Sequence, residues 1–250
     1  MPKLEVQLNE KKALVLEMEK VLRLATRRAE FSELWNLWVQ SKSGEWNEEE
    51  RALNPKLSDI HELPSVSFLL SENEAFTPVT KERFNAKMDC ILAERAEFMI
   101  KIKNDLARMV THPSANDLTV DLGILDHAIS LFPCSHSSIC NQLLPYPAIL
   151  LHEHYLQMEC RWDYFKPKIQ PDPNLRSTIE KVLDILCIPK DGPSAAIEEL
   201  HGRCVCLCGR HLYVDFGTLV ILIVVARDEF RAVDYPFLGS PSCSGEHLVR

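Results

Sequence analysis

The chain has 250 residues, a formal net charge of −8 from 28 Lys and Arg against 36 Asp and Glu, and a hydrophobic fraction of 46%. This composition is typical of a globular protein and excludes a wholly disordered, collagen-like or membrane-bundle chain. The acidic balance argues against broad electrostatic binding to nucleic acid or to anionic lipid. We therefore expect no nucleic acid and no membrane among the partners.

The use of cysteine indicates a reducing compartment. The opening Met1-Pro-Lys-Leu-Glu5 lacks the regions of a signal peptide, and the longest apolar run, Leu219 to Ala226, is far shorter than a bilayer span. Nine Cys is an odd number for a disulfide framework, so reduced thiols or metal ligands are expected. These features predict a protein of the cytoplasm or nucleus.

Residues 1–40 predict one long helix with two apolar faces. The first face is a stripe at helical spacing, made of Leu14, Met18, Val21, Leu22, Ala25 and Ala29. The second face lies on another side of the helix and is made of Phe31, Leu34, Trp35 and Trp38. Because large apolar faces seldom stay bare, we expect the second face either to bind a protein partner or to pack on the chain's own second long helix.

Residues 41–77 carry eight acidic and three basic residues and predict an acidic loop or linker. Within them, Leu63-Pro64-Ser-Val-Ser-Phe-Leu-Leu70 is similar to the Leu-Pro opening of an F-box, but the helical pattern that should follow is not seen, so no F-box is assigned. Residues 78–112 predict a long amphipathic helix. The simplest arrangement pairs this helix with residues 1–40 as a helical hairpin, and the alternative is that both helices cover a globular core.

The rest of the chain predicts a Cys- and His-rich domain over residues 121–230 and a loose tail over residues 231–250. The breaker cluster from Thr111 to Asp117 marks the boundary before this domain. The elements expected after it are a helix that starts at Asp172 and Pro173, a short helix over 192–200, a strand over 203–207 and a buried helix over 216–227.

The strongest site signal is Phe132-Pro-Cys134-Ser-His136-Ser-Ser-Ile-Cys140, followed twelve residues later by His152-Glu-His154. Thiolates on a tight loop and imidazoles at the end of the next helix are the donors that tetrahedral zinc favours. Cys134, Cys140 and His152 are the first predicted ligands, and His154 and His136 compete for the fourth position. Four protein ligands leave no position for a substrate, so a structural zinc ion is expected. The alternative is a set of buried thiols with core or solvated histidines.

A second cluster, Cys204-Val-Cys206-Leu-Cys208, places its thiols on one face if the segment is extended. Cys206 and Cys208 are therefore lesser candidates for zinc ligands, in a site of their own or in a composite site with the first cluster. The alternative is the edge of a β-hairpin with small buried thiols.

Four stretches in this order resemble a fungal F-box-associated family with a carboxy-terminal Cys/His-rich region. They are Pro78-Val-Thr-Lys-Glu-Arg-Phe84, Leu125-Asp-His-Ala-Ile-Ser-Leu-Phe-Pro-Cys134, Tyr146-Pro-Ala-Ile-Leu-Leu-His152 and Arg203-Cys-Val-Cys-Leu-Cys208. Members of this family often carry an amino-terminal F-box, which docks to a Skp-type adaptor of a ubiquitin ligase while the remainder selects a target. The resemblance thus implies a target-recognition role, although this chain departs from the family pattern in showing no F-box.

The predicted function is a non-enzymatic, intracellular protein-interaction module with a structural zinc site. Its fold class is α+β, mostly α, with long N-terminal helices followed by a small zinc-stapled domain. One alternative is the target-recognition part of an F-box-type ubiquitin-ligase adaptor, and another is a Cys/His hydrolase that uses Cys134, Cys140 or Cys206. The sequence contains no glycine-rich phosphate loop, nucleophile elbow or HExxH motif, which argues against an enzyme. The expected partner is an unidentified protein, and the long helices allow self-association.

Overall fold

The computed structural model describes residues 2–71, 77–111, 120–135, 140, 142–157, 160–171, 173–199, 205–206, 220 and 248–249. They form a mostly helical α+β structure, which confirms the predicted fold class. The chain divides into two compact units, Met1–Ile100 and Lys101–Arg250. No helix in the described part combines the length and the apolar character that a membrane crossing requires.

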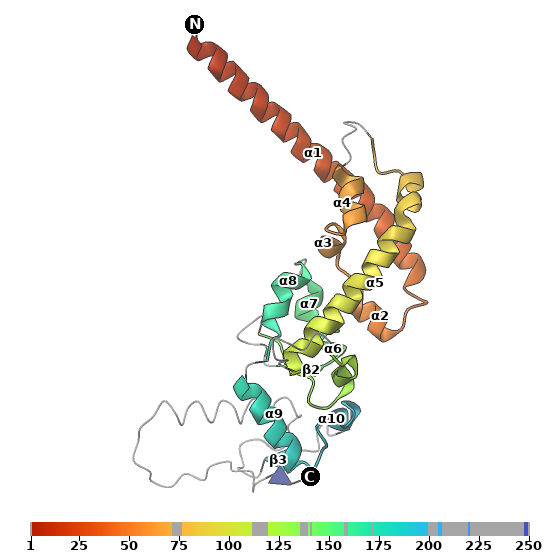
Figure 1. Cartoon of the computed structure of the whole chain (residues 1–250), viewed down its shortest axis with the longest axis vertical. Helices are drawn as coiled ribbons and strands as arrows, with labels where there is room; N and C mark the ends of the chain where they lie inside the picture. Colours follow the sequence, from red (N-terminus) through yellow and green to blue (C-terminus); the bar gives the residue numbers. More distant parts are fainter. Residues whose placement is uncertain are drawn as a thin grey trace. The chain divides into compact units, whose positions relative to one another are not determined.

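Two long helices dominate the chain (Figure 1). Helix α1 spans Pro2–Lys42 and helix α5 spans Lys81–Thr111, in agreement with the helices predicted over residues 1–40 and 78–112. The Oγ1 atom of Thr80 accepts a hydrogen bond from the backbone N–H of Arg83 at 3.4 Å. A threonine hydroxyl in this position caps the first turn of a helix, which explains why α5 begins here.

Three short helices take the place of the acidic loop predicted over residues 41–77. They are α2 (Glu48–Leu53), α3 (Leu57–Ile60) and α4 (Pro64–Ser71). Asn47 starts α2 through a capping box, in which its side chain accepts from the Glu50 N–H at 2.8 Å while the Glu50 carboxylate accepts from the Asn47 N–H at 3.0 Å. The helix dipole favours acidic residues in such a first turn, so the run of glutamates from Glu48 signals a helix start.

The short helices are held in place by apolar burial. Their buried residues include Leu53, Ile60, Val66, Leu69 and Leu70. Helix α4 starts at Pro64, so the helix that the sequence did not reveal after Leu63 is present. The linker assignment is corrected accordingly, because this acidic segment contributes apolar side chains to the core of the first unit.

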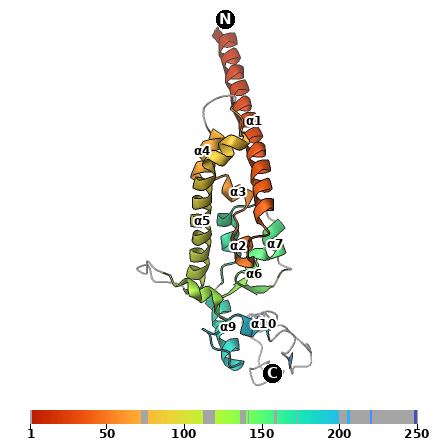
Figure 2. The same cartoon turned by 90° about the vertical axis from the view of Figure 1, so that its right-hand side faces the viewer.

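The two long helices run in the same direction (Figures 1 and 2). The ring of Phe31 in α1 packs edge-on against Phe84 near the start of α5, with 5.6 Å between centroids. Trp46, just after α1, lies under the guanidinium of Arg95, further along α5, at 4.8 Å. The predicted helical hairpin is therefore corrected, because α2, α3 and α4 carry the chain back along α1 before α5 begins.

The second apolar face of α1 belongs to the core of the first unit. Phe31 and Trp35 expose 0% and 2% of their surface, and Leu34 and Trp38 pack against the same cluster. Phe84 and Ile91 of α5 are members of that cluster too. This face therefore packs on the chain's own helices, as one of the two alternatives predicted, and it is not available as a binding surface.

The second unit is built from short elements that follow the last turns of α5. In chain order they are η1 (Leu122–Asp126), β1 (Leu131–Pro133), β2 (Leu143–Pro145), α6 (Ala148–Leu151), α7 (Glu153–Gln157), α8 (Trp162–Phe165), η2 (Lys166–Lys168), α9 (Pro173–Ile185), α10 (Ala195–Glu198), β3 (Val205–Cys206) and β4 (Leu248–Val249). Strands β1 and β2 pair antiparallel, with Leu131 opposite Pro145. The buried face of α9 packs on this hairpin through Ile179, Val182 and Leu183, which gives the unit its apolar core.

The described residues near the end of the chain agree with part of the prediction. Strand β3 lies within the strand predicted over 203–207 and pairs antiparallel with β4, so two residues of the predicted loose tail form a strand. Val220 is helical and buried, within the helix predicted over 216–227. The rest of that helix, the rest of the tail and the expected cap Asp172 lie outside the described residues.

Candidate metal centre

The β1–β2 hairpin positions the first candidate ligand. Cys134 follows β1 directly, and its backbone N–H donates to the carbonyl of Gln142 at 3.0 Å. The next N–H, that of Ser135, donates to the carbonyl of Lys168 at 2.9 Å. These two hydrogen bonds fix the backbone at Cys134. The residue is only 3% exposed, so its thiol is buried.

The two histidines come from the junction between α6 and α7. His152 follows α6 with an extended backbone, φ −61° and ψ 137°, which ends that helix. Its carbonyl accepts hydrogen bonds from the N–H groups of Tyr155 at 2.9 Å and Leu156 at 3.0 Å, and so starts α7. His154 lies in the first turn of α7. The break between the helices lets two histidines only two residues apart turn toward one point.

Helix α8 packs against α7 and holds it in place. The ring of Tyr155 packs on Phe165 with 4.1 Å between centroids. The indole N–H of Trp162 donates to the Asp105 carboxylate at 2.8 Å, and the Lys166 ammonium donates to its other oxygen at 2.8 Å. This buried network anchors α8, and through the Tyr155 contact it fixes the helix that carries His154.

Four side chains converge at this centre. Cys134, Cys140, His152 and His154 each present one ligand atom, and these atoms all lie within 4.8 Å of one another. The Cys134 Sγ lies 3.5 Å from His154 Nδ1, the Cys140 Sγ lies 3.3 Å from His152 Nε2, and the two ring nitrogens are 3.1 Å apart. The imidazole planes are nearly perpendicular, at 87°. The residues are close enough to hold a metal ion.

The spacing of these atoms resembles the edges of a zinc tetrahedron. With Zn–S of about 2.3 Å and Zn–N of about 2.05 Å at tetrahedral angles, sulfur and nitrogen ligands should be about 3.6 Å apart and two nitrogens about 3.3 Å apart. The three distances given above differ from these values by only a few tenths of an ångström. All six separations among the four atoms are at most 4.8 Å, so one ion could reach them once the side chains adjust.

The electrostatics of the centre favour the ligand form of His152. Burial lowers the pKa of His152 from its ordinary value of 6.5, the neighbouring His154 lowers it further, and Glu153 opposes both. A lowered pKa keeps the imidazole neutral near pH 7, and a neutral ring nitrogen is the form that binds a metal ion. Cys134 and His152 are buried, whereas Cys140 and His154 are partly exposed, so the centre sits at the edge of the unit.

The structure brings together the three first predicted ligands and His154, one of the two candidates for the fourth position. Of the competing candidates, His136 and Cys208 lie outside the described residues, as does Cys204. Cys206 lies in β3, but its side chain is not among those described. The second cluster therefore stays a prediction. The cysteines whose side chains are described are free thiols, namely Cys90, Cys134, Cys140, Cys160 and Cys187.

Several groups that shape the centre were not identified from the sequence. The backbone carbonyls of Gln142 and Lys168 accept hydrogen bonds from the N–H groups of Cys134 and Ser135. Every residue type has such a carbonyl, so the sequence does not reveal these contacts. Tyr155 is another such group, since it is only 3% exposed and packs on Phe165. Its place ten residues before Phe165, in a separate short helix, gives no periodic pattern that could have revealed the contact.

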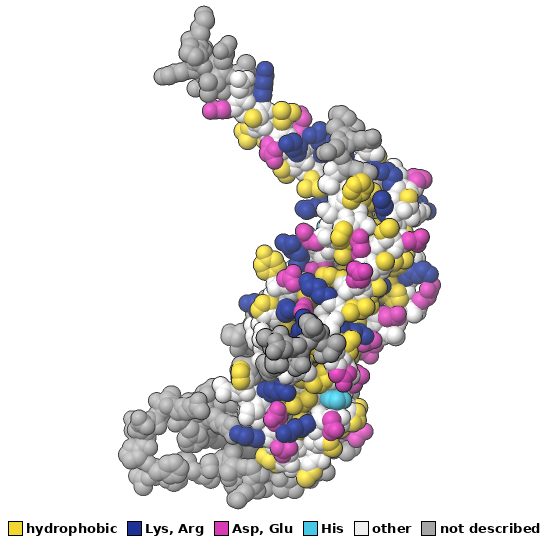
Figure 3. Space-filling model, viewed as in Figure 1, with side chains coloured by type: hydrophobic (Ala, Val, Ile, Leu, Met, Phe, Trp, Pro, Cys, Tyr) yellow, Lys and Arg dark blue, Asp and Glu magenta, His cyan; other side chains and the backbone are white. Residues whose placement is uncertain are grey.

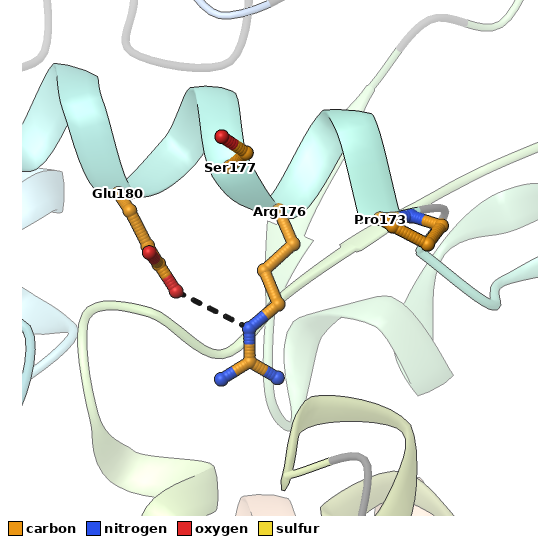
Figure 4. A pocket seen from close by; sticks show the side chains of 4 residues that line it. All are labelled: Pro173, Arg176, Ser177 and Glu180. Atoms are coloured by element: carbon orange, nitrogen blue, oxygen red, sulfur yellow. Dashed lines mark hydrogen bonds and ion pairs between the residues drawn. The ribbon is translucent and has the colours of Figure 1, made fainter.

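A hollow beside α9 is a further feature of the second unit (Figure 4). It is lined by Pro173, Arg176, Ser177 and Glu180. The Nε atom of Arg176 donates to the Glu180 carboxylate at 3.3 Å, so the two charges compensate each other. The lining contains neither Cys nor His, and it offers no cluster comparable to that around Cys134.

Comparisons of the chain with protein-family models, with curated proteins and with solved structures give no match. The resemblance to the fungal F-box-associated family therefore stays a prediction. The geometry of the four-residue centre is the feature of the described chain that bears on function.

Proposed function

We propose that Cys134, Cys140, His152 and His154 bind one zinc ion, and that this ion stabilises the second unit of a non-enzymatic protein-interaction module. The observation that carries the proposal is the convergence of four ligand atoms from three separate points of the chain within 4.8 Å. Two thiolates with two imidazoles are the donor set of many structural zinc sites. Hard oxygen donors, which Mg²⁺ and Ca²⁺ require, take no part in the cluster.

A structural role follows from the number of ligands and from their surroundings. Four protein ligands fill the tetrahedral shell, so no position is left for a catalytic water or a substrate. The segments that the ion would join are a strand of three residues (Leu131–Pro133) and helices of four and five residues (Ala148–Leu151 and Glu153–Gln157). Elements this short bury little surface by themselves, so a metal ion adds much of the stability that holds them together.

A Cys/His hydrolase is the second candidate, because the Cys140 thiol lies 3.3 Å from a ring nitrogen of His152. A nucleophilic thiol needs such a base, but the base must in turn be oriented by a third group while the thiol stays open to substrate. Here the atom facing His152 Nε2 is another ring nitrogen, that of His154 at 3.1 Å. The hydrolase predicts one thiol that reacts unusually fast with iodoacetamide at pH 7, whereas a zinc site predicts slow labelling until the metal is removed.

Native mass spectrometry before and after treatment with a chelator tests the proposal. We expect one zinc ion per chain, lost on chelation and restored by added zinc. Cys134→Ser should abolish stoichiometric binding, because it removes a buried thiolate ligand. Cys160→Ser is the control, since it makes the same chemical change at a cysteine of the same unit that lies outside the cluster. Protein that takes up no zinc at micromolar concentrations, or a Cys134→Ser variant that binds it as well as the Cys160→Ser control, would overturn the proposal.

A further inference from the structure

The amino-terminal part of α1 carries an apolar stripe that the described part of its own chain leaves uncovered. Every side chain from residue 9 to residue 22 is exposed, and this stretch projects as a single helix from the first unit (Figures 1 and 2). The large apolar residues Leu14, Val15, Met18, Val21 and Leu22 each expose between 54% and 68% of their surface. Hydrophobic side chains lie on the surface of this arm among charged ones in the space-filling view (Figure 3).

The stripe has the seven-residue spacing of a coiled coil. With Val15 and Leu22 at positions a, Met18 falls at position d, and Ala25 and Ala29, also exposed, continue the d and a positions. Leu14 and Val21 fall at position g beside this seam. Charged residues lie on the opposite side, where Glu17 and Lys20 form an exposed ion pair of 3.4 Å at positions c and f. The stripe at positions a, d and g is therefore apolar from residue 14 to residue 22, whereas positions b, c and f carry both charged residues and the exposed Leu16.

The charges along the seam distinguish the two ways of pairing two copies. Lys11 falls at position d, so a parallel dimer would place two lysine ammonium groups directly opposite each other. An antiparallel dimer instead pairs a positions with d positions. If Val15 meets Met18 of the second copy, Lys11 meets Leu22, along which its aliphatic stem can pack.

The flanking charges are complementary in the same antiparallel register. Lys12 and Glu19 both fall at position e, and antiparallel helices bring e positions together. In the register set by Val15 and Met18, Lys12 of each copy faces Glu19 of the other, so the dimer gains two symmetric ion pairs.

At the g positions Leu14 faces Val21, which widens the apolar seam. In the parallel arrangement the partners of Lys12 and Glu19 would be Gln7 and Leu14, which carry no charge.

We propose that α1 pairs with α1 of a second copy of this chain in an antiparallel, two-fold symmetric coiled coil over residues 11–22. A lone helix gains no stability from tertiary packing, and pairing along the stripe supplies the burial that this arm lacks. The contact is isologous, so it closes on itself and produces a dimer. The dimer extends the proposed interaction role with a defined partner, and it does not depend on the zinc site.

Sedimentation equilibrium of the full chain tests the pairing. We expect the chain to be dimeric when its concentration is tens of micromolar. Met18→Glu places a charge in both central layers and should raise the dimer Kd about 100-fold. Leu16→Glu is the matched control, because Leu16 is 57% exposed on the same helix but lies at position b, off the stripe, and this variant should dimerise like the wild type. Circular dichroism checks that both variants keep their helix content.

Charge reversal tests the antiparallel register. Lys12→Glu alone and Glu19→Lys alone each set like charges against one another and should raise the Kd about tenfold, while the double variant restores the ion pairs and most of the affinity. A parallel dimer would show no such rescue.

Three outcomes overturn the proposal. They are a monomer at 100 μM, a dimer insensitive to Met18→Glu, and a dimer whose charge reversals are not rescued by the double variant. A monomer whose arm resists trypsin would show that another part of the same chain covers the stripe, which also overturns it. Because the zinc measurement is made on a different unit, loss of zinc binding with an intact dimer, or the reverse, separates failure of the zinc proposal from failure of this one.

Discussion

At the metal centre, residue types and their spacing predict most of the candidate ligands but not all of their geometry. Two Cys separated by five residues and a His-x-His pair twelve residues later were enough to predict Cys134, Cys140 and His152. The sequence left the fourth position open between His136 and His154, and the structure brings His154 to the cluster. Which ring nitrogen faces the centre, Nε2 of His152 and Nδ1 of His154, depends on the break between α6 and α7, and no residue type encodes that choice.

Asp105 is a buried polar residue whose hydrogen bonds should contribute to the stability of the second unit. Asp105→Ala would leave the buried N–H of Trp162 and the ammonium of Lys166 without their 2.8 Å acceptor, and should lower the free energy of unfolding by about 2–3 kcal/mol. Asp163→Ala is the control, because the Lys101–Asp163 ion pair is exposed and its loss should cost less than about 1 kcal/mol. Urea unfolding followed by circular dichroism measures both, and equal effects would contradict the assignment.

His61 should make the stability of the first unit depend on pH. Burial, helped by the charge of Arg28, lowers the pKa of His61 below its ordinary 6.5. The Ser32 hydroxyl donates to the Arg28 carbonyl and lies 3.3 Å from His61 Nε2, as expected for a neutral ring that donates to it. Above pH 6.5 the ring is neutral in both the folded and the unfolded state. As the pH falls below this value, the unfolded state binds the proton first, so stability declines down to the lowered pKa.

The comparison of wild type with His61→Gln measures this contribution. Glutamine keeps an N–H donor near Ser32 but does not titrate. Urea unfolding at pH 7.5 and pH 5.5 should show a smaller loss of stability in the variant than in the wild type. An equal loss in both proteins would show that other groups account for the pH dependence.

At the scale of elements, length decides what a sequence pattern reveals. Helices α1 and α5 have 41 and 31 residues, so their apolar residues repeat over many turns and both were predicted. Helices α2, α3 and α4 have 6, 4 and 8 residues, too few turns for a periodic signal. The usable signals were local ones, namely the Asn47 and Glu50 pair of the capping box and the proline at the start of α4.

Glu94 connects two of these helices and should govern the stability of α4. Its carboxylate accepts hydrogen bonds from the backbone N–H of Ser65 at 3.1 and 3.0 Å and from the Ser65 hydroxyl at 2.7 Å. A carboxylate supplied by α5 thus caps the start of α4, where the helix dipole also favours it. Glu94→Ala should cost about 1–2 kcal/mol and speed amide exchange in α4. Glu97→Ala, on an exposed position of the same helix, should leave that exchange unchanged.

At the scale of the whole molecule, the direction of the long helices could not be deduced from their own sequences. Amphipathic stripes show that α1 and α5 bury a face, but a parallel and an antiparallel pair bury such faces equally well. The choice depends on the segment between them, and its three short helices return the chain along α1. The division into two units at Ile100, within the continuous helix α5, likewise leaves no mark in the sequence.

The two units should respond differently to removal of metal. All four ligands lie in the second unit, so chelation should speed amide exchange in β1, β2, α6 and α7. The core of the first unit around Phe31 and Phe84 contains no ligand and should keep its protection. Hydrogen exchange by mass spectrometry, with and without chelator, measures both regions in one experiment. Equal loss of protection in both units would contradict a local structural role for the ion.

X-ray absorption spectroscopy of the zinc-loaded protein tests the central claim most directly, because it reports the atoms bound to the ion. Two thiolates and two imidazoles predict two sulfur neighbours at about 2.3 Å, two nitrogen neighbours at about 2.0–2.1 Å and no bound water. Cys134→Ser should reduce the sulfur count in the spectrum of any remaining zinc. A shell of oxygen and nitrogen atoms without sulfur in the wild-type protein would contradict the account.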